Sequence, residues 1–488
     1  MSSDIRVRFC PSPTGNPHVG MIRTALFNWA FARHVGGTFV FRIEDTDAAR
    51  DSQESYQALL DSMRWLGLNW DEGPEVGGQY GPYRQSERHD LYTTVIDSLA
   101  DSGYTYPCFC TTEELDARRE IAMQEKRAPG YDGHCRDLSE AEREVYRQQG
   151  RASVIRFRMP GHDFVWDDLI RGEVTFKAEH VPDFVIVRAN GDPLYTLVNP
   201  VDDALMRITH VLRGEDLLSS TPRQLALFEA LVEIGVAQYI PSYGHLPYVM
   251  GEGNKKLSKR DPESSLAMYR EQGYLPAALL NYLALLGWSM GNDQEFFSLE
   301  DMARAFTLER VNPNPARFDL KKCTAINADW IRFIPPAELT DQLLPFLVRS
   351  EVLGDQPSEH ELEILSKIVP LIQQRLEILS DAPALISFMF VDSVSIDPTL
   401  WAQDSAEVLE RSLAAIEQVS PWTAEQIQAA LRESLVTELG LKPKVAFGPV
   451  RTAITGSKVS PPLFESMEIL GQQACLGRLR AASESLQG

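Results

Sequence analysis

Residues 5–43 have the sequence IRVRFCPSPTGNPHVGMIRTALFNWAFARHVGGTFVFRI, and this stretch decides the fold class. Residues 5–10 alternate apolar and polar side chains, which predicts a strand. Apolar side chains recur at helical spacing from Gly20 onward, until two glycines at 36–37 end the helix. Residues 38–43 predict a second strand. Strand, loop, helix and strand in about 40 residues predict a βαβ unit and therefore a parallel sheet.

The middle of the chain departs from this pattern. Residues 54–68 and 88–102 predict further helices, but a polar, charge-rich segment follows residue 108. The strands expected beyond it lie at 153–159, at 174–176, and in a hairpin of 183–188 and 194–198 around Asn190-Gly191-Asp192. This mixture predicts an α+β insertion within the α/β unit.

The α/β pattern resumes near residue 208. A strand is expected at 208–212, a helix at 219–234 with Pro222 in its first turn, and a strand at 246–250. After about residue 265, leucine-rich periodicity predicts helices to the end of the chain. The sequence therefore predicts an α/β domain that is interrupted by an insertion and followed by all-α domains.

The composition excludes several classes of protein. The 488 residues are 44% hydrophobic and 24% charged, as in ordinary globular proteins, so the chain is neither disordered nor collagenous. No stretch reaches the roughly 20 apolar residues of a membrane span, and the first residues lack a secretory signal. Six cysteines are too few for a disulfide framework. We expect a reduced, cytoplasmic protein that has no membrane partner.

The net charge is −22, because 47 Lys and Arg stand against 69 Asp and Glu. Phosphate repels such a charge, so the whole-chain balance argues against a protein that coats itself in nucleic acid. Binding is local, however, and residues 440–488 carry six basic side chains against three acidic ones. This C-terminal surface is either a solvated helical face or a patch that binds one RNA.

The loop at residues 11–20 is the first motif with a chemical meaning. It carries Thr14, Gly15, His18 and Gly20 between the first strand and its helix. A helix start offers N–H groups and the positive end of the dipole to phosphate, and an imidazole there can donate to a phosphate oxygen. The alternative is a rigid βα loop with a surface histidine.

A second motif is the glycine-flanked run Lys255-Lys256-Leu257-Ser258-Lys259-Arg260. Its four cations could neutralise a triphosphate in a transition state, although a solvated basic loop is the simpler explanation of the run alone. The chain has neither a GxxxxGK[ST] nor a GxGxxG motif, which excludes phosphate-loop kinases and dinucleotide-binding dehydrogenases.

Together the two motifs resemble the HIGH and KMSKS signatures of class I aminoacyl-tRNA synthetases, here His18-Val19-Gly20-Met21 and Lys256-Leu257-Ser258-Lys259-Arg260. Residues 11–20, 42–47 (RIEDTD), 81–86 (GPYRQS) and 213–216 (RGED) resemble bacterial-type glutamyl-tRNA synthetases. The resemblance covers essentially the whole chain. Met21 stands where the second histidine of HIGH would be, so the catalytic role of that histidine is not carried over.

The resemblance implies a Rossmann-like catalytic domain and helical anticodon-binding domains. It also implies that ATP and glutamate give glutamyl-adenylate, usually with tRNA bound, and that the glutamyl group passes to the terminal adenosine of tRNA-Glu. His18, Lys256 and Lys259 would stabilise charge on the phosphates, with Mg²⁺ on the triphosphate. The implied ATP-binding residues are Thr14, Gly15, His18, Gly20, Lys256, Leu257, Ser258, Lys259 and Arg260.

The resemblance further implies a glutamate pocket that is built on charge. Arg8 and Arg213 would face the carboxylates, because guanidinium groups bind carboxylates in a bidentate manner. Glu44 would hold the α-ammonium group. Further implied pocket residues are Ser12, Tyr195 and Asn199. Without the resemblance, Arg8 would be an exposed strand residue and Glu44 an ion-pair partner of Arg42.

Three cysteines, Cys108, Cys110 and Cys135, have a spacing that suits the thiolate ligands of zinc. Some members of the family hold zinc in this insertion. The fourth ligand stays open among Tyr131, His134 and Asp137. Three ordinary buried thiols are the alternative.

In the C-terminal half, the implied tRNA contacts are Gln373, Lys442, Lys444 and Arg451. In this family an arginine of the anticodon domain is linked to the rejection of tRNA-Gln. We align Gln373 with that arginine, which favours an enzyme that also charges tRNA-Gln.

The expected division of the chain follows the same resemblance. Residues 1–108 and 195–250 would form the two halves of the catalytic domain, 109–194 the inserted acceptor-stem-binding domain, 251–325 the basic loop and a helical stem-contact domain, and 326–382 and 383–488 two anticodon-binding domains. We expect a monomer.

Three other functions share parts of this pattern. A truncated relative that glutamylates a modified tRNA base would lack the roughly 160 residues after 325. A non-catalytic tRNA-binding protein would not need His18 and an intact Lys-Leu-Ser-Lys-Arg loop. A generic nucleotidylyltransferase would not need the helical C-terminal half.

Overall fold

The computed structural model describes residues 4–46, 51–126, 130–258, 261–291 and 293–487. Its internal contacts divide the chain into two compact units. The first contains Met1–Met268 and Leu279–Leu320, and the second contains Tyr269–Ala278 and Lys321–Gly488. In the described part of the chain, every strand lies in the first unit.

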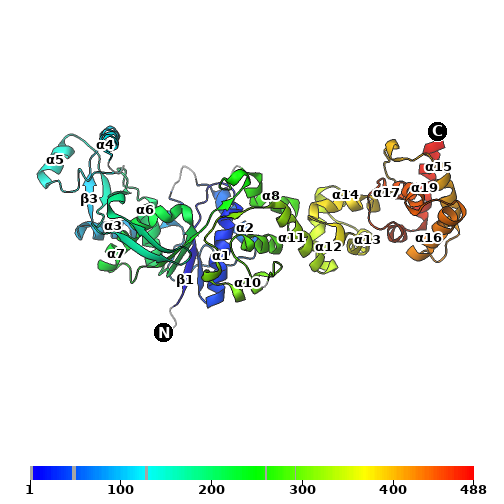
Figure 1. Cartoon of the computed structure of the whole chain (residues 1–488), viewed down its shortest axis with the longest axis horizontal. Helices are drawn as coiled ribbons and strands as arrows, with labels where there is room; N and C mark the ends of the chain where they lie inside the picture. The colour runs from blue at the N-terminus through cyan, green and yellow to red at the C-terminus, as the bar shows by residue number, and fades with distance from the viewer. Residues whose placement is uncertain (1–3, 47–50, 127–129, 259–260, 292, 488) are drawn as a thin grey trace. The chain divides into compact units, whose positions relative to one another are not determined.

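The first strands form the predicted βαβ unit. β1 (Arg6–Phe9) pairs in parallel with β2 (Thr38–Phe41), and α1 (Val19–Val35) connects them (Figure 1). Gly36 ends α1 in the left-handed conformation with a φ of 65°, which glycine adopts without a steric cost.

Two later strands extend this arrangement. β8 (His210–Gly214) and β9 (Ser242–Leu246) form a second parallel pair, and α7 (Thr221–Glu233) connects them, with Pro222 in its first turn. The backbone N–H of Thr209 donates to the carbonyl of Arg6 at 2.9 Å, so β8 begins beside β1. The α/β prediction is confirmed for this unit.

The segment between the two parallel pairs is the predicted α+β insertion. Its strands are β3 (Thr105–Cys108), β4 (Val154–Phe157), β5 (Phe164–Asp168), β6 (Gly172–Phe176) and β7 (Phe184–Val187). β3, β4 and β7 form one antiparallel sheet, while β5 and β6 form a hairpin. α4 (Thr112–Gln124) and α5 (Glu140–Gln148) each begin with a capping box.

Two predicted strands differ from the structure. Residues 194–198 are not a hairpin strand, because they begin α6 (Tyr195–Leu205), a helix with eight consecutive buried residues. An apolar run without helical periodicity cannot be distinguished from a strand by its pattern. The strand predicted at 246–250 is misplaced, since β9 ends at Leu246. Pro247, which has no N–H, separates it from the short β10 (Val249–Met250).

The remaining helices and the last strand of the first unit are α2 (Gln53–Trp65), α3 (His89–Asp101), α10 (Leu299–Ala305) and β11 (Ala316–Arg317), which pairs with β10. The predicted helices at 54–68 and 88–102 correspond to α2 and α3. Two helices, α8 (Leu266–Gln272) and α9 (Pro276–Leu285), contain residues of both units.

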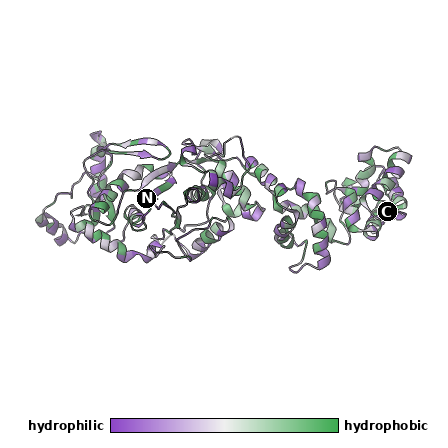
Figure 2. Ribbon diagram, turned by 90° about the horizontal axis from the view of Figure 1, so that it is seen from below, coloured by the Kyte–Doolittle hydropathy of each residue, from purple (hydrophilic) through white to green (hydrophobic). Residues whose placement is uncertain are grey.

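The second unit is helical, as predicted. Its α-helices are α11 (Leu320–Phe333), α12 (Pro336–Arg349), α13 (Glu359–Ile372), α14 (Ala382–Ile386), α15 (Ser405–Glu417), α16 (Ala424–Leu431), α17 (Pro443–Thr455), α18 (Leu463–Leu470) and α19 (Gln472–Gln487). Figure 2 shows hydrophobic and hydrophilic residues mixed along these helices, as expected when one face packs into a core. Val408, Leu431 and Leu479 are fully buried in such a core. Among the described residues, no helix combines the length and apolar character needed to cross a membrane.

Candidate active site

A cavity of about 370 Å³ lies at the carboxyl ends of β1 and β8, beside the start of α1. Ligand sites of α/β sheets lie at this end of the strands. The predicted site residues that line the cavity are Arg8, His18, Gly20, Glu44, Tyr195, Arg213, Lys256 and Leu257. The fold therefore gathers both sequence motifs and most of the predicted glutamate ligands in one place.

His18 is the N-cap of α1. Its Nδ1 atom accepts a hydrogen bond from the backbone N–H of Met21 at 3.2 Å. A neutral imidazole that accepts through Nδ1 carries its proton on Nε2, so the ring can donate to an anion from Nε2. Gly20 lies close to this ring, because a Cβ atom at Gly20 would meet His18 Nδ1 at 3.3 Å.

Arg8 and Glu44 belong to a buried network of charges. Arg8 Nε donates to Asp203 Oδ1 at 3.1 Å, and Arg42 donates to Asp203 at 2.8 Å and to Glu44 at 3.2 Å. Arg8 is 2% exposed, so it is not the exposed strand residue of the alternative explanation. Glu44 makes the alternative ion pair with Arg42 and also lines the cavity. Burial raises the pKa of the Glu44 carboxyl, against the opposing effect of Arg42.

Arg213, in β8, is held on three sides. Its Nε donates to His245 Nε2 at 3.1 Å, its Nη1 to Gln224 Oε1 at 2.6 Å, and its Nη2 to Thr221 Oγ1 at 2.9 Å. The side chain is buried and lines the cavity. Nη2 also donates to the carbonyl of Leu217 at 3.3 Å. These bonds fix the plane of a charged guanidinium group and leave one Nη1 N–H that can donate to a carboxylate.

Lys256 belongs to the basic loop, and its side chain lines the cavity. Its Nζ lies 3.2 Å from Asp216 Oδ2 and 4.4 Å from the centre of the Tyr248 ring. The pair is half exposed, so its net energy is small and an anionic ligand can compete for the ammonium group. Lys259 and Arg260 lie outside the described residues.

The cavity lining does not include Ser12, Thr14, Gly15, Asn199 or Ser258. Asn199 stands behind Glu44, because its Nδ2 donates to Glu44 Oε1 at 2.5 Å. The backbone N–H of Ser258 donates to the Asp261 carboxylate at 2.7 Å. These two residues lie next to the site in the described structure rather than in its wall.

The lining also contains residues that the sequence did not assign to the site, among them Cys10, Arg23, Asp216 and Tyr248. Arg23 Nη1 donates to the carbonyl of Pro247 at 2.8 Å, and burial lowers its pKa to about 10. The available signal in the sequence is one arginine among mostly apolar residues in the first turns of the helix. A single basic residue there does not distinguish a buried cation from a solvated one.

Comparison with known proteins identifies the family. The family model described as "tRNA synthetases class I (E and Q), catalytic domain" matches residues 4–325, and the model "Anticodon binding domain" matches residues 338–483. The glutamate–tRNA ligase of Rhodococcus jostii (strain RHA1) is 58% identical over 493 aligned residues that cover 100% of both chains. The chain belongs to the glutamate–tRNA ligase family of class I tRNA synthetases.

Two further members of this family resemble the chain over nearly its whole length. The glutamate–tRNA ligase of Nocardioides sp. (strain ATCC BAA-499 / JS614) is 57% identical and covers 98% of both chains. The crystal structure of a glutamate tRNA ligase from Elizabethkingia meningosepticum CCUG26117 in complex with its amino acid is 32% identical, with a TM-score of 0.87. That match covers 99% of this chain and 100% of the other.

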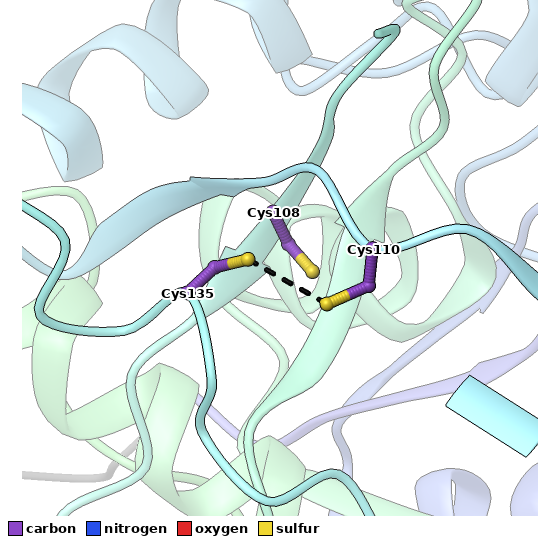
Figure 3. Close-up of side chains that lie close together, drawn as sticks. All are labelled: Cys108, Cys110 and Cys135. Atoms are coloured by element: carbon purple, nitrogen blue, oxygen red, sulfur yellow. Dashed lines mark hydrogen bonds between the residues drawn. The ribbon is translucent and has the colours of Figure 1, made fainter. Parts of the chain in front are cut away.

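In the present structure, the three cysteines of the insertion lie together. Figure 3 shows the sulfur atoms of Cys108, Cys110 and Cys135 turned toward one another, and all three Sγ atoms lie within 4.8 Å of one another. Tyr131 Oη lies 3.5 Å from Cys108 Sγ and accepts the backbone N–H of Cys135 at 2.7 Å. Asp137 instead pairs with Arg158 at 3.1 Å, and its side chain is 85% exposed.

Gln373 has a structural partner at the end of α11. Its Nε2 donates to the carbonyls of Ile331 and Ile334, both at 2.8 Å, and the residue is 6% exposed. These carbonyls belong to the C-terminal end of a helix, where acceptors lack intrahelical partners. In this structure Gln373 therefore supplies hydrogen-bond donors to carbonyl groups at the end of α11.

The predicted basic residues of α17 differ in exposure. Lys442 and Lys444 are exposed at the start of the helix, whereas Arg451 is half buried and donates to Ser460 Oγ and to the Pro461 carbonyl. Arg478, which contributed to the positive charge of residues 440–488, is 5% exposed and donates to three backbone carbonyls. It adds no cation to an exposed patch.

Proposed function

We propose that this chain activates glutamate with ATP and transfers it to tRNA-Glu. The observation that carries the proposal is the pairing, in one cavity, of a phosphate-binding side and a carboxylate-binding side. His18, Gly20 and Lys256 line the first, and Arg8, Glu44 and Arg213 line the second. The glutamate carboxylate, held on the second side, attacks the α-phosphate of ATP, held on the first. Glutamyl-adenylate forms and pyrophosphate leaves.

The phosphate side works through charge. Charge develops on phosphate oxygens when the carboxylate attacks, and fixed donors at those oxygens stabilise the transition state. His18 donates from Nε2, and Lys256 can exchange Asp216 for phosphate. Lys259 and Arg260, with Leu257 and Ser258, belong to the same proposed ATP-binding loop, as do Thr14 and Gly15 before the helix. Bound Mg²⁺ on the triphosphate would supply Lewis acidity there.

The glutamate side also works through charge. Arg213 presents a fixed guanidinium group to a carboxylate, and Arg8 adds a second one. The carboxylate of Glu44 is buried, so a bound ammonium group would compensate for the water that it lacks. Tyr195 lines the same wall, Asn199 orients Glu44, and Ser12 completes the proposed pocket.

Zinc fits the cysteine cluster of the insertion. Three thiolates and a phenolate oxygen are donors that zinc accepts in tetrahedral sites, and Tyr131 is the fourth donor that the geometry favours. Asp137 is turned to Arg158, and His134 Nε2 lies 3.3 Å from Tyr146 Oη. When bound, zinc would tie the end of β3 to the loop of Cys135.

Metal analysis tests this zinc site. Protein purified without added zinc should contain about one zinc per chain, and Cys135→Ser should lose it. Cys475→Ser is the control, because Cys475 is a buried cysteine of the second unit. A wild-type content far below one per chain would show that the three residues are ordinary thiols.

The second unit binds tRNA through its basic side chains. Lys442 and Lys444 would contact phosphate. Arg451 donates to the side chain of Ser460 and Arg375 to its backbone carbonyl, so the two guanidinium groups lie close together, and we place unpaired bases beside them. In a salt titration, the pair Lys442→Ala and Lys444→Ala should weaken tRNA binding and flatten its salt dependence. An unchanged slope would remove both residues from the interface.

Gln373 bears on the choice between tRNAs. A glutamine at the position that we align with the tRNA-Gln-rejecting arginine favours charging of both tRNA-Glu and tRNA-Gln. Charging assays with both tRNAs test this, and strict rejection of tRNA-Gln would exclude it. The six-part domain division given above belongs to the same proposal, as do a monomeric state and a cytoplasmic location.

ATP–pyrophosphate exchange tests the main function. Exchange should require glutamate, and tRNA-Glu should stimulate it strongly. The aminoacylated terminus should then appear in a charging assay with tRNA-Glu. A base-glutamylating enzyme would not charge the terminus, a nucleotidylyltransferase would not respond to both ligands, and a binding protein would show no exchange.

A further inference from the structure

A buried histidine–aspartate pair lies directly behind Arg213. The side chains of His245, in β9, and Asp168, at the end of β5, both have 0% exposure. His245 Nδ1 lies 2.5 Å from Asp168 Oδ2, and His245 Nε2 lies 3.1 Å from Arg213 Nε. The imidazole therefore stands between a carboxylate and the guanidinium group of the proposed glutamate pocket.

The neighbours of this imidazole specify one tautomer. Asp168 is a carboxylate that only accepts, so Nδ1 carries the proton. Arg213 Nε only donates, and the Thr221 hydroxyl, whose Oγ1 lies 3.1 Å from Nε2, can also donate, so Nε2 is the unprotonated acceptor. Burial lowers the pKa of His245, and the charge of Arg213 acts in the same direction against the effect of Asp168. The ring is therefore neutral at physiological pH, with its proton on Nδ1.

The carboxylate of Asp168 is fixed as well. Its Oδ1 accepts the backbone N–H groups of His245, Ile170 and Arg171 at 3.1, 3.2 and 3.1 Å. Oδ2 is left for the imidazole, with Trp166 Nε1 at 3.4 Å. Because three donors converge on Oδ1, an amide at this position would keep its oxygen there and turn its nitrogen toward His245.

We propose that Asp168 and His245 are positioning residues for glutamate recognition, and that the Nδ1–H tautomer holds the Arg213 guanidinium group in the plane that binds the glutamate carboxylate. The inference rests on the proposed role of Arg213. Asp168 belongs to the inserted segment, whereas His245 and Arg213 belong to β9 and β8. The amino-acid pocket thus depends on a residue of the insertion.

Asp168→Asn tests the proposal. Its amide would donate to His245 Nδ1 and move the proton to Nε2, where it opposes the Arg213 Nε–H. The glutamate KM in tRNA-dependent ATP–pyrophosphate exchange should rise about tenfold or more, with the ATP KM unchanged. In ¹⁵N-histidine-labelled protein, NMR should show a proton on Nδ1 of His245 in the wild type and on Nε2 in the variant.

Two further variants make the experiment decisive. Asp167→Asn removes the same charge one residue earlier in β5, at an exposed position, and should change neither KM nor the tautomer. His245→Phe keeps a ring and removes both nitrogen atoms. It identifies the His245 signals, should raise the glutamate KM in the same way, and covers the case in which Asp168→Asn does not fold.

The outcomes separate this inference from the proposed function. An unchanged glutamate KM in Asp168→Asn, or a raised one without the change of tautomer, overturns the inference. So does a wild-type His245 that is protonated on Nε2. If the wild type shows no glutamate-dependent exchange, the proposed function fails, while the NMR result still reports the tautomer.

Discussion

His18 Nδ1 accepts the backbone N–H of Met21 at 3.2 Å, so one side chain both caps α1 and forms part of the cavity wall. The capping bond is made three residues along the chain, which is the usual reach of an N-cap side chain. It also fixes which ring nitrogen carries the proton. The spacing His-Val-Gly-Met is therefore the spacing of a helix cap, in which Met21 contributes its backbone N–H.

We expect Gly20→Ala to slow the reaction without unfolding the protein. The new Cβ would lie 3.3 Å from His18 Nδ1 and 3.4 Å from Cε1, so the ring must move by a few tenths of an ångström. Alanine favours a helix more than glycine does, so stability should not fall. Exchange kinetics should show kcat reduced about tenfold.

Gly448→Ala is the matched control for this variant. Gly448 also lies in a helix, α17, and nothing lies within 4 Å of its added Cβ. It should keep its kcat. A normal kcat in Gly20→Ala would mean that the exact position of the His18 ring is unimportant.

Arg213→Ala should lower kcat/KM for glutamate. The loss should correspond to an increase of about 2 to 4 kcal/mol in activation free energy, as expected for a lost charge-assisted pair. Arg213→Lys should recover only part of this loss, because lysine keeps the charge but lacks the planar fork. ATP–pyrophosphate exchange at varied glutamate gives both numbers. Near-normal glutamate activation in Arg213→Ala would remove this residue from the pocket.

The thiol of Cys10 should be almost inert at neutral pH. Burial raises its pKa to about 11, so about one thousandth of the thiol is ionised at pH 8. Alkylation by iodoacetamide should accelerate about tenfold per pH unit up to that pKa, because only the thiolate reacts. Peptide mass spectrometry follows the reaction, with denatured protein as the reference. Alkylation in the folded protein at the rate of the denatured one would contradict the assigned burial.

Gln373→Leu should destabilise the second unit by about 1 to 3 kcal/mol, because it leaves buried carbonyls of α11 without a donor. Urea unfolding measures the loss. Gln374→Leu is the control, since Gln374 is exposed beside it and should change stability little. Equal stability of the two variants would show that the cap at the end of α11 contributes nothing measurable.

The sequence predicted the parts of the site that have a local cause. His18 lies at a helix start that the pattern of residues 5–43 already specifies, and Lys256 lies in a loop whose charges are contiguous. Arg8 shows the limit of such reasoning, because its burial depends on Asp203 of α6, which lies 195 residues away in the sequence.

Burial by distant segments was not visible in the sequence. Arg478 contributes to the positive charge of residues 440–488, but it is buried, and its guanidinium group donates to the carbonyls of Phe388, Val391 and Ile454. Residues 194–198 (LYTLV) form a short apolar run that does not distinguish a strand from the start of α6, and the polar residues at helical spacing, Asn199, Asp202 and Asp203, follow only after it. His245 carried no signal, since its partners Asp168 and Arg213 lie 77 and 32 residues away.

Tyr269–Ala278 belong to the second unit, although residues 279–320, which follow them in the chain, belong to the first. This order matters when the chain is recombined with a homologue. Leu275 donates its backbone N–H to Asn327 Oδ1 at 2.8 Å, and Leu379 donates to the carbonyl of Gly273 at 3.1 Å. The helical unit is thus encoded in two separate pieces. A hybrid made with a homologue by a single crossover near residue 325 would inherit mismatched pieces, whereas a hybrid that also exchanges residues 269–278 would keep them matched.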